Sequence, residues 1–329
     1  MTDKFTFVEA CLQVIAALQL GCLQNLYVTM IFFIFYLTLF TTYWPIVLLS
    51  ILWTWYDRET PFKGGRSLRL LIALPFWKHL PDYFPVSLVK IADLDPNRNY
   101  LFCSHPHGLL GTASFINLSL GLAPNKAYFP GFNTKLAVKD LNVFYPFLRD
   151  IALECGVISA SKQSLEYLLN DKQKGNIVTL IIGGAEEVIH SMPGHYRIIL
   201  NKRKGFVKLA LTLGCCLVPV FNFGENDIYE LLIPKSGTLL HRLQQWLKRN
   251  TGFLFVLPKG VLGLPFLPKR KPLTTVVGTP IEIPKIEEPT REEIDQYHKL
   301  YTEELVKLFH EHKHKYVKDP ENTHLEIVG

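Results

Sequence analysis

The chain has 329 residues, of which 48% are apolar and 12% aromatic, and a formal net charge of +6 at pH 7. So high an apolar content predicts contact with lipid. The basic residues are dispersed along the chain instead of forming a stripe with interleaved aromatic side chains, which excludes nucleic acid as an expected partner. The six cysteines form no CxxC pair, so we expect neither a zinc knuckle nor a disulfide framework.

An uncharged stretch, residues 10–56, lies between Glu9 and Asp57. One helical crossing of a bilayer takes about 20 residues, so this stretch has room for two. Residues 41–45 (Thr-Thr-Tyr-Trp-Pro) suit a turn, because Tyr and Trp prefer the membrane interface and proline suits the first turn of a helix. We therefore expect residues 1–56 to form an N-terminal transmembrane helical hairpin with both ends in the cytosol. The alternatives are one crossing with one interfacial helix, a tight re-entrant hairpin, and a buried helical pair of a soluble protein.

The rest of the chain, residues 57–329, is expected to be a single α/β domain facing the cytosol. Strand-like and helical patterns alternate along it, which predicts a mainly parallel sheet. The strand-like runs are 100–103, 177–182, 216–221 and 274–277, and the helical patterns are 161–170, 206–213 and 239–248. Thr290 and Glu293 form a capping box that opens a long final helix.

Two histidines, His105 and His107, follow the first of these strands and flank Pro106. Imidazole can take up and return a proton near neutral pH, which makes it the usual general base. Gly108 closes the motif, and proline restricts the backbone around it, so the rings are held in place. A lone histidine beside a strand is most often structural, but this pair favours a catalytic loop.

A second motif, Gly183-Gly184 followed by Glu186 and Glu187, comes directly after the strand-like run 177–182. Glycines at a strand end expose backbone N–H groups that can hold an oxyanion or a phosphate. A neighbouring carboxylate can orient an imidazole. The alternative is that the two glutamates form a solvated surface.

A third motif is the basic cluster in residues 201–208, with the four cations Lys202, Arg203, Lys204 and Lys208, which enters a helix. Cations at a helix start suit a phosphate-bearing ligand, and a solvated basic face is the alternative. The His-rich segment 310–314 lies on the polar end of the last helix, so we expect no metal site there.

These motifs, in this order, resemble the type 2 diacylglycerol acyltransferase family, which includes monoacylglycerol and wax-alcohol acyltransferases. The resemblance covers nearly the whole chain. It also rests on the segments 83–85 (Tyr-Phe-Pro), 223–226 (Phe-Gly-Glu-Asn) and 272–278 (Pro-Leu-Thr-Thr-Val-Val-Gly). It implies a glycerophosphate-acyltransferase-like fold and a multi-pass protein of the endoplasmic reticulum membrane, with lipid droplets as a second location.

The resemblance also implies roles for individual residues. His107 is the general base, His105 its motif partner, and Glu187 the carboxylate that orients the ring, since counting from the glycine pair selects it over Glu186. The related glycerophosphate acyltransferases carry an aspartate five residues after the catalytic histidine. Here those positions hold Leu110 and Thr112, so that local relay is absent.

The remaining roles concern binding. Backbone N–H groups near Gly108 or Gly184 stabilise the oxyanion. Arg203, Lys204 and Lys208 contact the phosphates of acyl-CoA, which is a co-substrate, and no further cofactor or metal is expected.

The implied reaction moves a fatty acyl group from acyl-CoA to a lipid hydroxyl without a covalent acyl-enzyme. We expect an acylglycerol acceptor, either diacylglycerol or 2-monoacylglycerol. A long-chain alcohol acceptor, a membrane hydrolase and a non-catalytic lipid-binding protein are the alternatives. The expected partners are acyl-CoA, the acylglycerol, a phospholipid membrane and, as an open question, a second copy of the chain.

Overall fold

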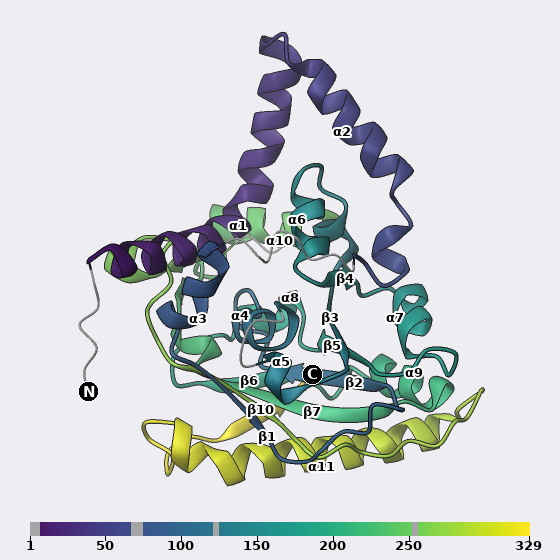
Figure 1. The fold of residues 1–329 in the computed structure, drawn as a ribbon. Helices are drawn as coiled ribbons and strands as arrows, with labels where there is room; N and C mark the ends of the chain where they lie inside the picture. Colours follow the sequence, from purple (N-terminus) through teal and green to yellow (C-terminus); the bar gives the residue numbers. More distant parts are fainter. Residues whose placement is uncertain (1–6, 67–74, 121–124, 252–255) are drawn as a thin grey trace.

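A computed structural model of the protein describes residues 7–66, 75–120, 125–251 and 256–329 (Figure 1). In this part of the chain, seven strands form one sheet in the order β1-β10-β7-β2-β5-β3-β4. Every neighbouring pair is parallel except β10 with β7. The strands are β1 (Val86–Lys90), β2 (Tyr100–His105), β3 (Asn133–Val138), β4 (Val157–Ser159), β5 (Asn176–Ile181), β7 (Cys216–Phe223) and β10 (Leu273–Val277).

Two strand pairs and a series of helices complete the domain. The pairs are β6 (Tyr196–Ile199) with β11 (Leu325–Val328), and β8 (Glu230–Leu232) with β9 (Leu257–Lys259). The helices are α1 (Phe7–Phe40), α2 (Trp44–Tyr56), α3 (His79–Tyr83), α4 (Thr112–Ser114), α5 (Asn125–Tyr128), α6 (Leu148–Glu154), α7 (Lys162–Leu169), α8 (Ala185–Val188), α9 (Gly205–Leu213), α10 (Leu239–Thr251) and α11 (Arg291–Tyr316). Shorter helical turns are η1 (Thr60–Phe62), η3 (Pro75–Lys78), η4 (Phe115–Ser119), η5 (Asp140–Val143), η6 (Glu225–Asp227) and η7 (Val261–Gly263).

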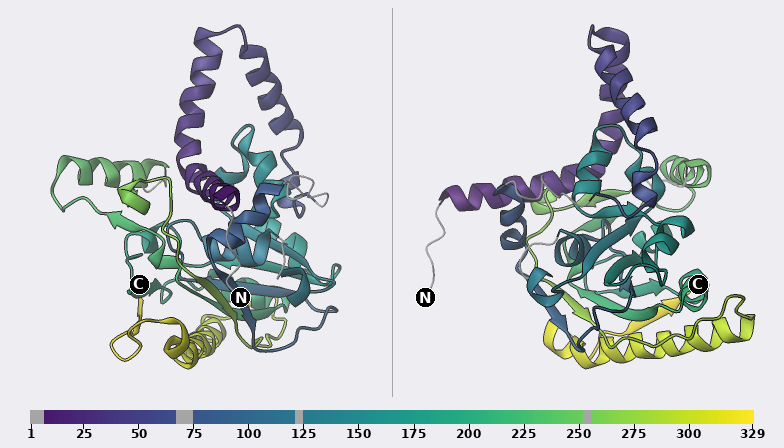
Figure 2. Two further views of the ribbon diagram at one scale, coloured as in Figure 1. Left: turned by 60° about the vertical axis from the view of Figure 1, so that its left-hand side comes forward. Right: turned by 45° about the vertical axis from the view of Figure 1, so that its right-hand side comes forward.

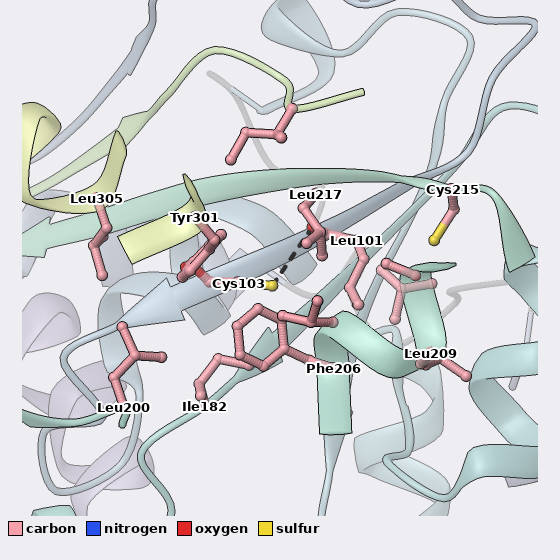
Figure 3. Packing of buried hydrophobic residues seen from close by; sticks show 14 of the residues in the cluster. Leu101, Cys103, Ile182, Leu200, Phe206, Leu209, Cys215, Leu217, Tyr301 and Leu305 are labelled. Atoms are coloured by element: carbon pink, nitrogen blue, oxygen red, sulfur yellow. Dashed lines mark hydrogen bonds between the residues drawn. The ribbon is translucent and has the colours of Figure 1, made fainter. Parts of the chain in front are cut away.

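Helices cover both faces of the sheet. The long helix α11 runs along one face, and α4 and α8 lie on the opposite side (Figure 1). On the α11 face, Leu101 and Cys103 of β2 pack in one cluster with Phe206 of α9 and Tyr301 of α11 (Figure 3). On the other face, Phe102 packs with Leu118 and Phe129. Successive side chains of a strand point to opposite faces, so β2 divides its residues between two cores.

The predicted elements of the sheet are confirmed, with boundaries shifted by one or two residues. Thr290 accepts a hydrogen bond from the Glu293 backbone N–H at 3.2 Å, and the Glu293 side chain accepts one from the Thr290 N–H at 2.8 Å, so the capping box is also confirmed. Strands β1, β3 and β4 were not predicted, because each is short or carries polar residues that weaken its pattern.

The N-terminal region forms a helical hairpin, but the predicted transmembrane hairpin is wrong. α1 and α2 meet at residues 41–43, and Pro45 lies in the first turn of α2, as expected. Within the described residues, however, no helix combines the length and the apolar character that a bilayer crossing needs. α2 has 13 residues, and at 1.5 Å per residue it extends about 20 Å, whereas a bilayer core is about 30 Å thick. Residues 1–6 of the expected anchor lie outside the described part.

The hairpin projects from the α/β body, with the first half of α1 lying along the body and the second half rising with α2 (Figures 1 and 2). Its return to the body is held by ion pairs. The fully buried Arg149 donates to the Asp57 carboxylate at 2.8 Å and to the Asp57 carbonyl at 2.9 Å. Arg66 bridges Asp57 at 3.0 Å and Asp150 at 2.5 Å. The end of the hairpin is thereby tied to α6.

Candidate active site

The chemistry-bearing motifs meet at one edge of the sheet. Strands β5, β2 and β7 are adjacent and parallel, so their carboxyl ends lie together. The loop with His107 follows β2, the Gly183-Gly184 motif follows β5, and Glu225 follows β7. Residues far apart in the sequence are in this way brought to a single loop cluster.

His107 is held in one tautomer at the start of the loop. Its Nδ1 lies 3.0 Å from the Gly108 carbonyl oxygen. A carbonyl can only accept, so Nδ1 carries the proton and Nε2 keeps its lone pair. Nε2 has no hydrogen-bond partner among the described residues, and burial lowers the pKa of the ring below its usual value. The ring is therefore neutral at pH 7 and able to accept a proton.

Glu187 holds the backbone of His107, not its ring. One carboxylate oxygen accepts from the His107 backbone N–H at 2.5 Å, and the other accepts from the Ile199 backbone N–H at 2.7 Å. The side chain is 1% exposed, and burial raises its pKa to about 7. Gly183 makes room for it, since a Cβ there would lie 2.1 Å from the carboxylate. The structure thus places Glu187 beside His107, with the main chain as its point of contact.

His105 lies on the opposite face of the sheet, fully buried against α11. The Tyr301 hydroxyl donates to the Cys103 carbonyl at 3.1 Å. His105 Nε2 is 3.0 Å from that hydroxyl and is therefore the donor of their shared hydrogen bond. Burial lowers the pKa of His105 to about 3, so the ring stays neutral. The structure does not bring His105 to the side chain of His107.

A cavity of about 740 Å³ opens beside His107. This volume is typical of sites for small organic ligands. Most of its walls are apolar. The polar residues that line it are His107, Thr112, Lys139, Asp140, Asn142, Ser161 and Gly184. The apolar walls include Leu110, Phe115, Leu136, Ile151, Leu180 and Val188. His107, with its unprotonated Nε2, therefore lines a space whose walls suit an aliphatic chain.

Only one of the three predicted phosphate ligands lies near this cavity. Arg203 donates to the Gly183 carbonyl at 3.3 Å, and a Cβ on Gly184 would lie 3.6 Å from its guanidinium. Lys204 instead pairs with Asp295 of α11 at 2.5 Å, and Lys208 is exposed on α9.

Two further cations join Arg203 around Glu186. The Glu186 carboxylate lies 2.8 Å from Lys202, 3.3 Å from Arg203 and 3.8 Å from Lys248. These three cations hold the pKa of Glu186 below its usual range, although burial acts in the opposite direction. Lys248 belongs to α10 and lies 40 positions after Lys208, so the local pattern of the basic cluster does not include it.

Glu225 was also missed as a site residue. Its carboxylate, 1% exposed, accepts from the backbone N–H groups of Thr112 at 2.9 Å and Ala113 at 2.7 Å. Burial raises its pKa to about 7. Its position directly after a buried strand that neighbours β2 was the available signal, and the sequence motif 223–226 contained it.

Nothing in the described part of the chain groups three His, Cys, Asp or Glu side chains around a common point for a metal ion. The residues that do converge are a neutral imidazole, two buried carboxylates and a cationic rim beside an apolar cavity. Such an arrangement can remove a proton from a hydroxyl group and hold a ligand that is apolar at one end and anionic at the other.

Comparisons with known proteins agree with this chemistry. The diacylglycerol acyltransferase family model matches residues 36–328. The chain is 38% identical over 310 residues to 2-acylglycerol O-acyltransferase 1 of Mus musculus, covering 93% of this chain and 92% of that protein. It is 40% identical over 294 residues to diacylglycerol O-acyltransferase 2 of Homo sapiens, covering 87% and 75%.

A third relative, acyl-CoA wax alcohol acyltransferase 2 of Mus musculus, is 38% identical over 287 residues, covering 85% of this chain and 86% of that protein. No solved structure matches the chain. The family model extends from the second half of α1 to β11 and so includes the hairpin turn and the whole loop cluster. The chain therefore belongs to the diacylglycerol acyltransferase family and is an acyltransferase.

Proposed function

We propose that the protein transfers a fatty acyl group from acyl-CoA to the hydroxyl of an acylglycerol, with His107 as the general base. The observation that carries this proposal is that His107, whose Nδ1 is held by the Gly108 carbonyl and whose Nε2 is therefore unprotonated, lines the apolar cavity. The lowered pKa supports it, because the ring stays neutral and able to accept a proton at pH 7.

In the proposed reaction His107 Nε2 takes the proton of the acceptor hydroxyl as the oxygen attacks the thioester carbonyl. The backbone N–H of Gly184, on the cavity wall, stabilises the negative charge that develops on the carbonyl oxygen, and the N–H of Gly108 is the second candidate donor. The C–O bond forms and the C–S bond breaks. The CoA thiolate then receives the proton from the imidazolium, so no covalent acyl-enzyme is needed.

The phosphates of CoA bind, in this proposal, at the cationic rim formed by Lys202, Arg203 and Lys248. These side chains are between 29% and 49% exposed, so an anion can reach them from solvent. When no phosphate is bound, the Glu186 carboxylate pairs with these three cations, and a phosphate must displace it from them in order to bind. Lys204 is less suited than Arg203, because Asp295 already neutralises it.

The apolar cavity supports a lipid acceptor and an acyl chain. The relatives' names include a 2-acylglycerol, a diacylglycerol and a wax-alcohol acyltransferase, so we propose an acylglycerol for this chain and treat a long-chain alcohol as an outcome of the test. We also place the enzyme at the endoplasmic reticulum membrane. Exposed apolar side chains on the hairpin, such as Phe35 at 57% and Trp55 at 65%, support contact with lipid there.

The test uses microsomes that contain the wild type or His107→Gln, supplied with labelled oleoyl-CoA. Diacylglycerol, 2-monoacylglycerol or hexadecanol is offered as acceptor, and the products are separated by thin-layer chromatography. We expect a His107-dependent acylglycerol ester. If hexadecanol is the only acceptor that is esterified, the substrate is a long-chain alcohol and not an acylglycerol. Free oleate without any ester would indicate a hydrolase. Absence of every product from well-expressed wild type would favour a binding protein.

A further inference from the structure

Glu225 is a fully buried carboxylate beside the catalytic loop that none of the steps proposed above uses. It lies in η6, directly after β7, and the preceding Gly224 has a φ of +89° that turns the chain toward the loop. Its two oxygens accept separate backbone hydrogen bonds, from Thr112 at 2.9 Å and from Ala113 at 2.7 Å. Glu225 therefore holds the first residues of α4, which close the turn that begins at His107.

The same side chain supports Gly108 from behind. A Cβ at Gly108 would lie 2.4 Å from the Glu225 Cγ and 2.5 Å from its Oε1, so the Gly108 backbone rests directly on the carboxylate. Gly108 has a φ of +59°, which also favours glycine. Its carbonyl oxygen accepts the Nδ1–H of His107 at 3.0 Å. A continuous series of contacts thus joins Glu225, Gly108 and the ring of His107.

We propose that Glu225 is a positioning residue for acyl transfer: it fixes the turn 108–113 so that the Gly108 carbonyl holds His107 in the tautomer with a free Nε2. The inference rests on the proposed function, because it assumes that His107 is the base. In many acid–base sites a carboxylate contacts the imidazole directly. Here a backbone carbonyl contacts the ring, Glu187 holds the His107 backbone from one side, and Glu225 holds the turn from the other.

The hydrogen-bond pattern makes the Glu225 side chain specific. Both of its oxygens face backbone donors, and both Thr112 and Ala113 are themselves buried. A glutamine has nearly the same volume but replaces one acceptor with an NH2 group, which would face an N–H. Glu225→Gln therefore disturbs the turn without opening a cavity, which suits it to a kinetic test.

The experiment compares Glu225→Gln with Glu230→Gln in the full-length protein. Glu230 is exposed and pairs with Lys269, so the control makes the same chemical change on the surface. For Glu225→Gln we expect kcat to fall about 100-fold, as for a base displaced by about 1 Å, with KM for acyl-CoA and acceptor within threefold of wild type. The control stays within twofold. A kcat within twofold of wild type for folded Glu225→Gln overturns the proposal.

A second readout does not depend on turnover. Diethyl pyrocarbonate modifies the unprotonated imidazole nitrogen, and peptide mass spectrometry measures its rate at His107. In Glu225→Gln the turn no longer fixes the Gly108 carbonyl, so the hydrogen bond that this carbonyl accepts from His107 Nδ1 is weakened. That hydrogen bond raises the pKa of His107, and its loss also allows the ring to rotate. We expect the rate at His107 to change at least threefold in Glu225→Gln and to remain constant in Glu230→Gln. An unchanged rate at His107 in Glu225→Gln overturns the proposal.

A double variant separates this inference from the proposed function. If Glu225 acts through His107, Glu225→Gln lowers the residual rate of His107→Gln by less than twofold. A further 100-fold loss overturns the inference. Wild-type activity of His107→Gln would refute the base itself, whereas an inactive His107→Gln with a fully active Glu225→Gln would refute Glu225 alone.

Gly108→Ala tests the same contact if Glu225→Gln does not fold. It leaves the carboxylate in place and pushes the turn away from it, because the new Cβ would lie 2.4 Å from the Glu225 side chain. We expect a loss of kcat of the same size with KM unchanged. Wild-type kcat in folded Gly108→Ala overturns the proposal.

Discussion

His105 and His107 are two residues apart, yet they lie in opposite environments. His105 is fully buried against α11, where its Nε2–H donates a hydrogen bond to the Tyr301 hydroxyl. His107 lies on the other side, at the wall of the cavity, with Nε2 unprotonated. The same side chain is therefore part of the core at one position and, at the other, lines the cavity with an unprotonated Nε2.

The cause of this difference is the geometry of β2. His105 is in phase with Leu101 and Cys103, so the alternation of the strand carries it into the core on the α11 face. Strand β2 ends at His105, and His107 is free of that alternation. A repeated residue in a short motif thus does not imply a shared role, because the end of the strand falls between the two copies.

The largest effect that distinguishes the two sides is expected from His107→Gln. Loss of a general base lowers rates by about 10²–10⁴-fold, or about 3–5 kcal/mol in activation free energy. The ring is partly exposed, so we expect the melting temperature to change little. Initial rates with saturating acyl-CoA and acceptor, together with thermal unfolding, measure both. Retention of more than a tenth of kcat would contradict the comparison.

On the buried side, His105→Asn should change the pH dependence of stability. Folding lowers the pKa of His105 from 6.5 to about 3, so its contribution is complete above pH 6.5 and is lost as the pH falls toward 3. The full loss is on the order of 5 kcal/mol. Urea unfolding at pH 7, 6, 5 and 4 should give a shallower curve for the variant than for wild type.

The comparison with wild type is needed because Glu187 and Glu225 act in the opposite direction. Folding raises the pKa of each from 4.5 to about 7, so their contributions are present below pH 4.5 and lost as the pH rises through 7. Both proteins share these groups, so they cancel in the difference. Parallel curves for wild type and variant would contradict the assignment of His105 to the core.

A smaller effect is expected from Tyr301→Phe. The variant leaves the Cys103 carbonyl and His105 Nε2 without their shared partner, which costs about 1–3 kcal/mol of stability. Because Tyr301 does not line the cavity, kcat per folded molecule should stay within twofold of wild type. Thermal unfolding and specific activity of the folded fraction test this. A tenfold loss of kcat with unchanged stability would show that the two sides are coupled.

The smallest predicted effect concerns Arg203 and Lys204. Like His105 and His107, these residues are close in sequence, but one lies near the cavity and the other contacts α11. Arg203 contacts the Gly183 carbonyl near the cavity, whereas Lys204 pairs with Asp295 of α11. Arg203→Gln should raise KM for acyl-CoA about tenfold, or about 1.4 kcal/mol, and Lys204→Gln by less than twofold. An acyl-pantetheine substrate, which lacks the nucleotide phosphates, should remove the difference. Equal increases in KM for the two variants would contradict the proposal that the cationic rim binds the phosphates of CoA.

The hairpin shows where sequence patterns stop being sufficient. The turn at 41–45 and the proline at the start of α2 were predicted from local preferences and are confirmed, since both depend on a few consecutive residues. The predicted crossing is wrong because an uncharged composition does not by itself give helices of adequate length and hydropathy. The 13 residues of α2 show that it is not.

Alone, the sequence determined the sheet strands at 100–103, 177–182, 216–221 and 274–277, and the presence of His107 and the glycine pair at strand ends. These features follow from hydrophobic periodicity and from glycine and proline, which act on neighbouring residues. Only the tertiary structure decided which residues hold the loop. Glu187 accepts a hydrogen bond from the His107 backbone, and Glu225 accepts from the turn that follows it. The ion pair between Asp295 and Lys204 was likewise decided by the tertiary structure. Those contacts join residues 80, 113 and 91 positions apart, and such pairings arise from the order of the strands in the sheet, which no local pattern contains.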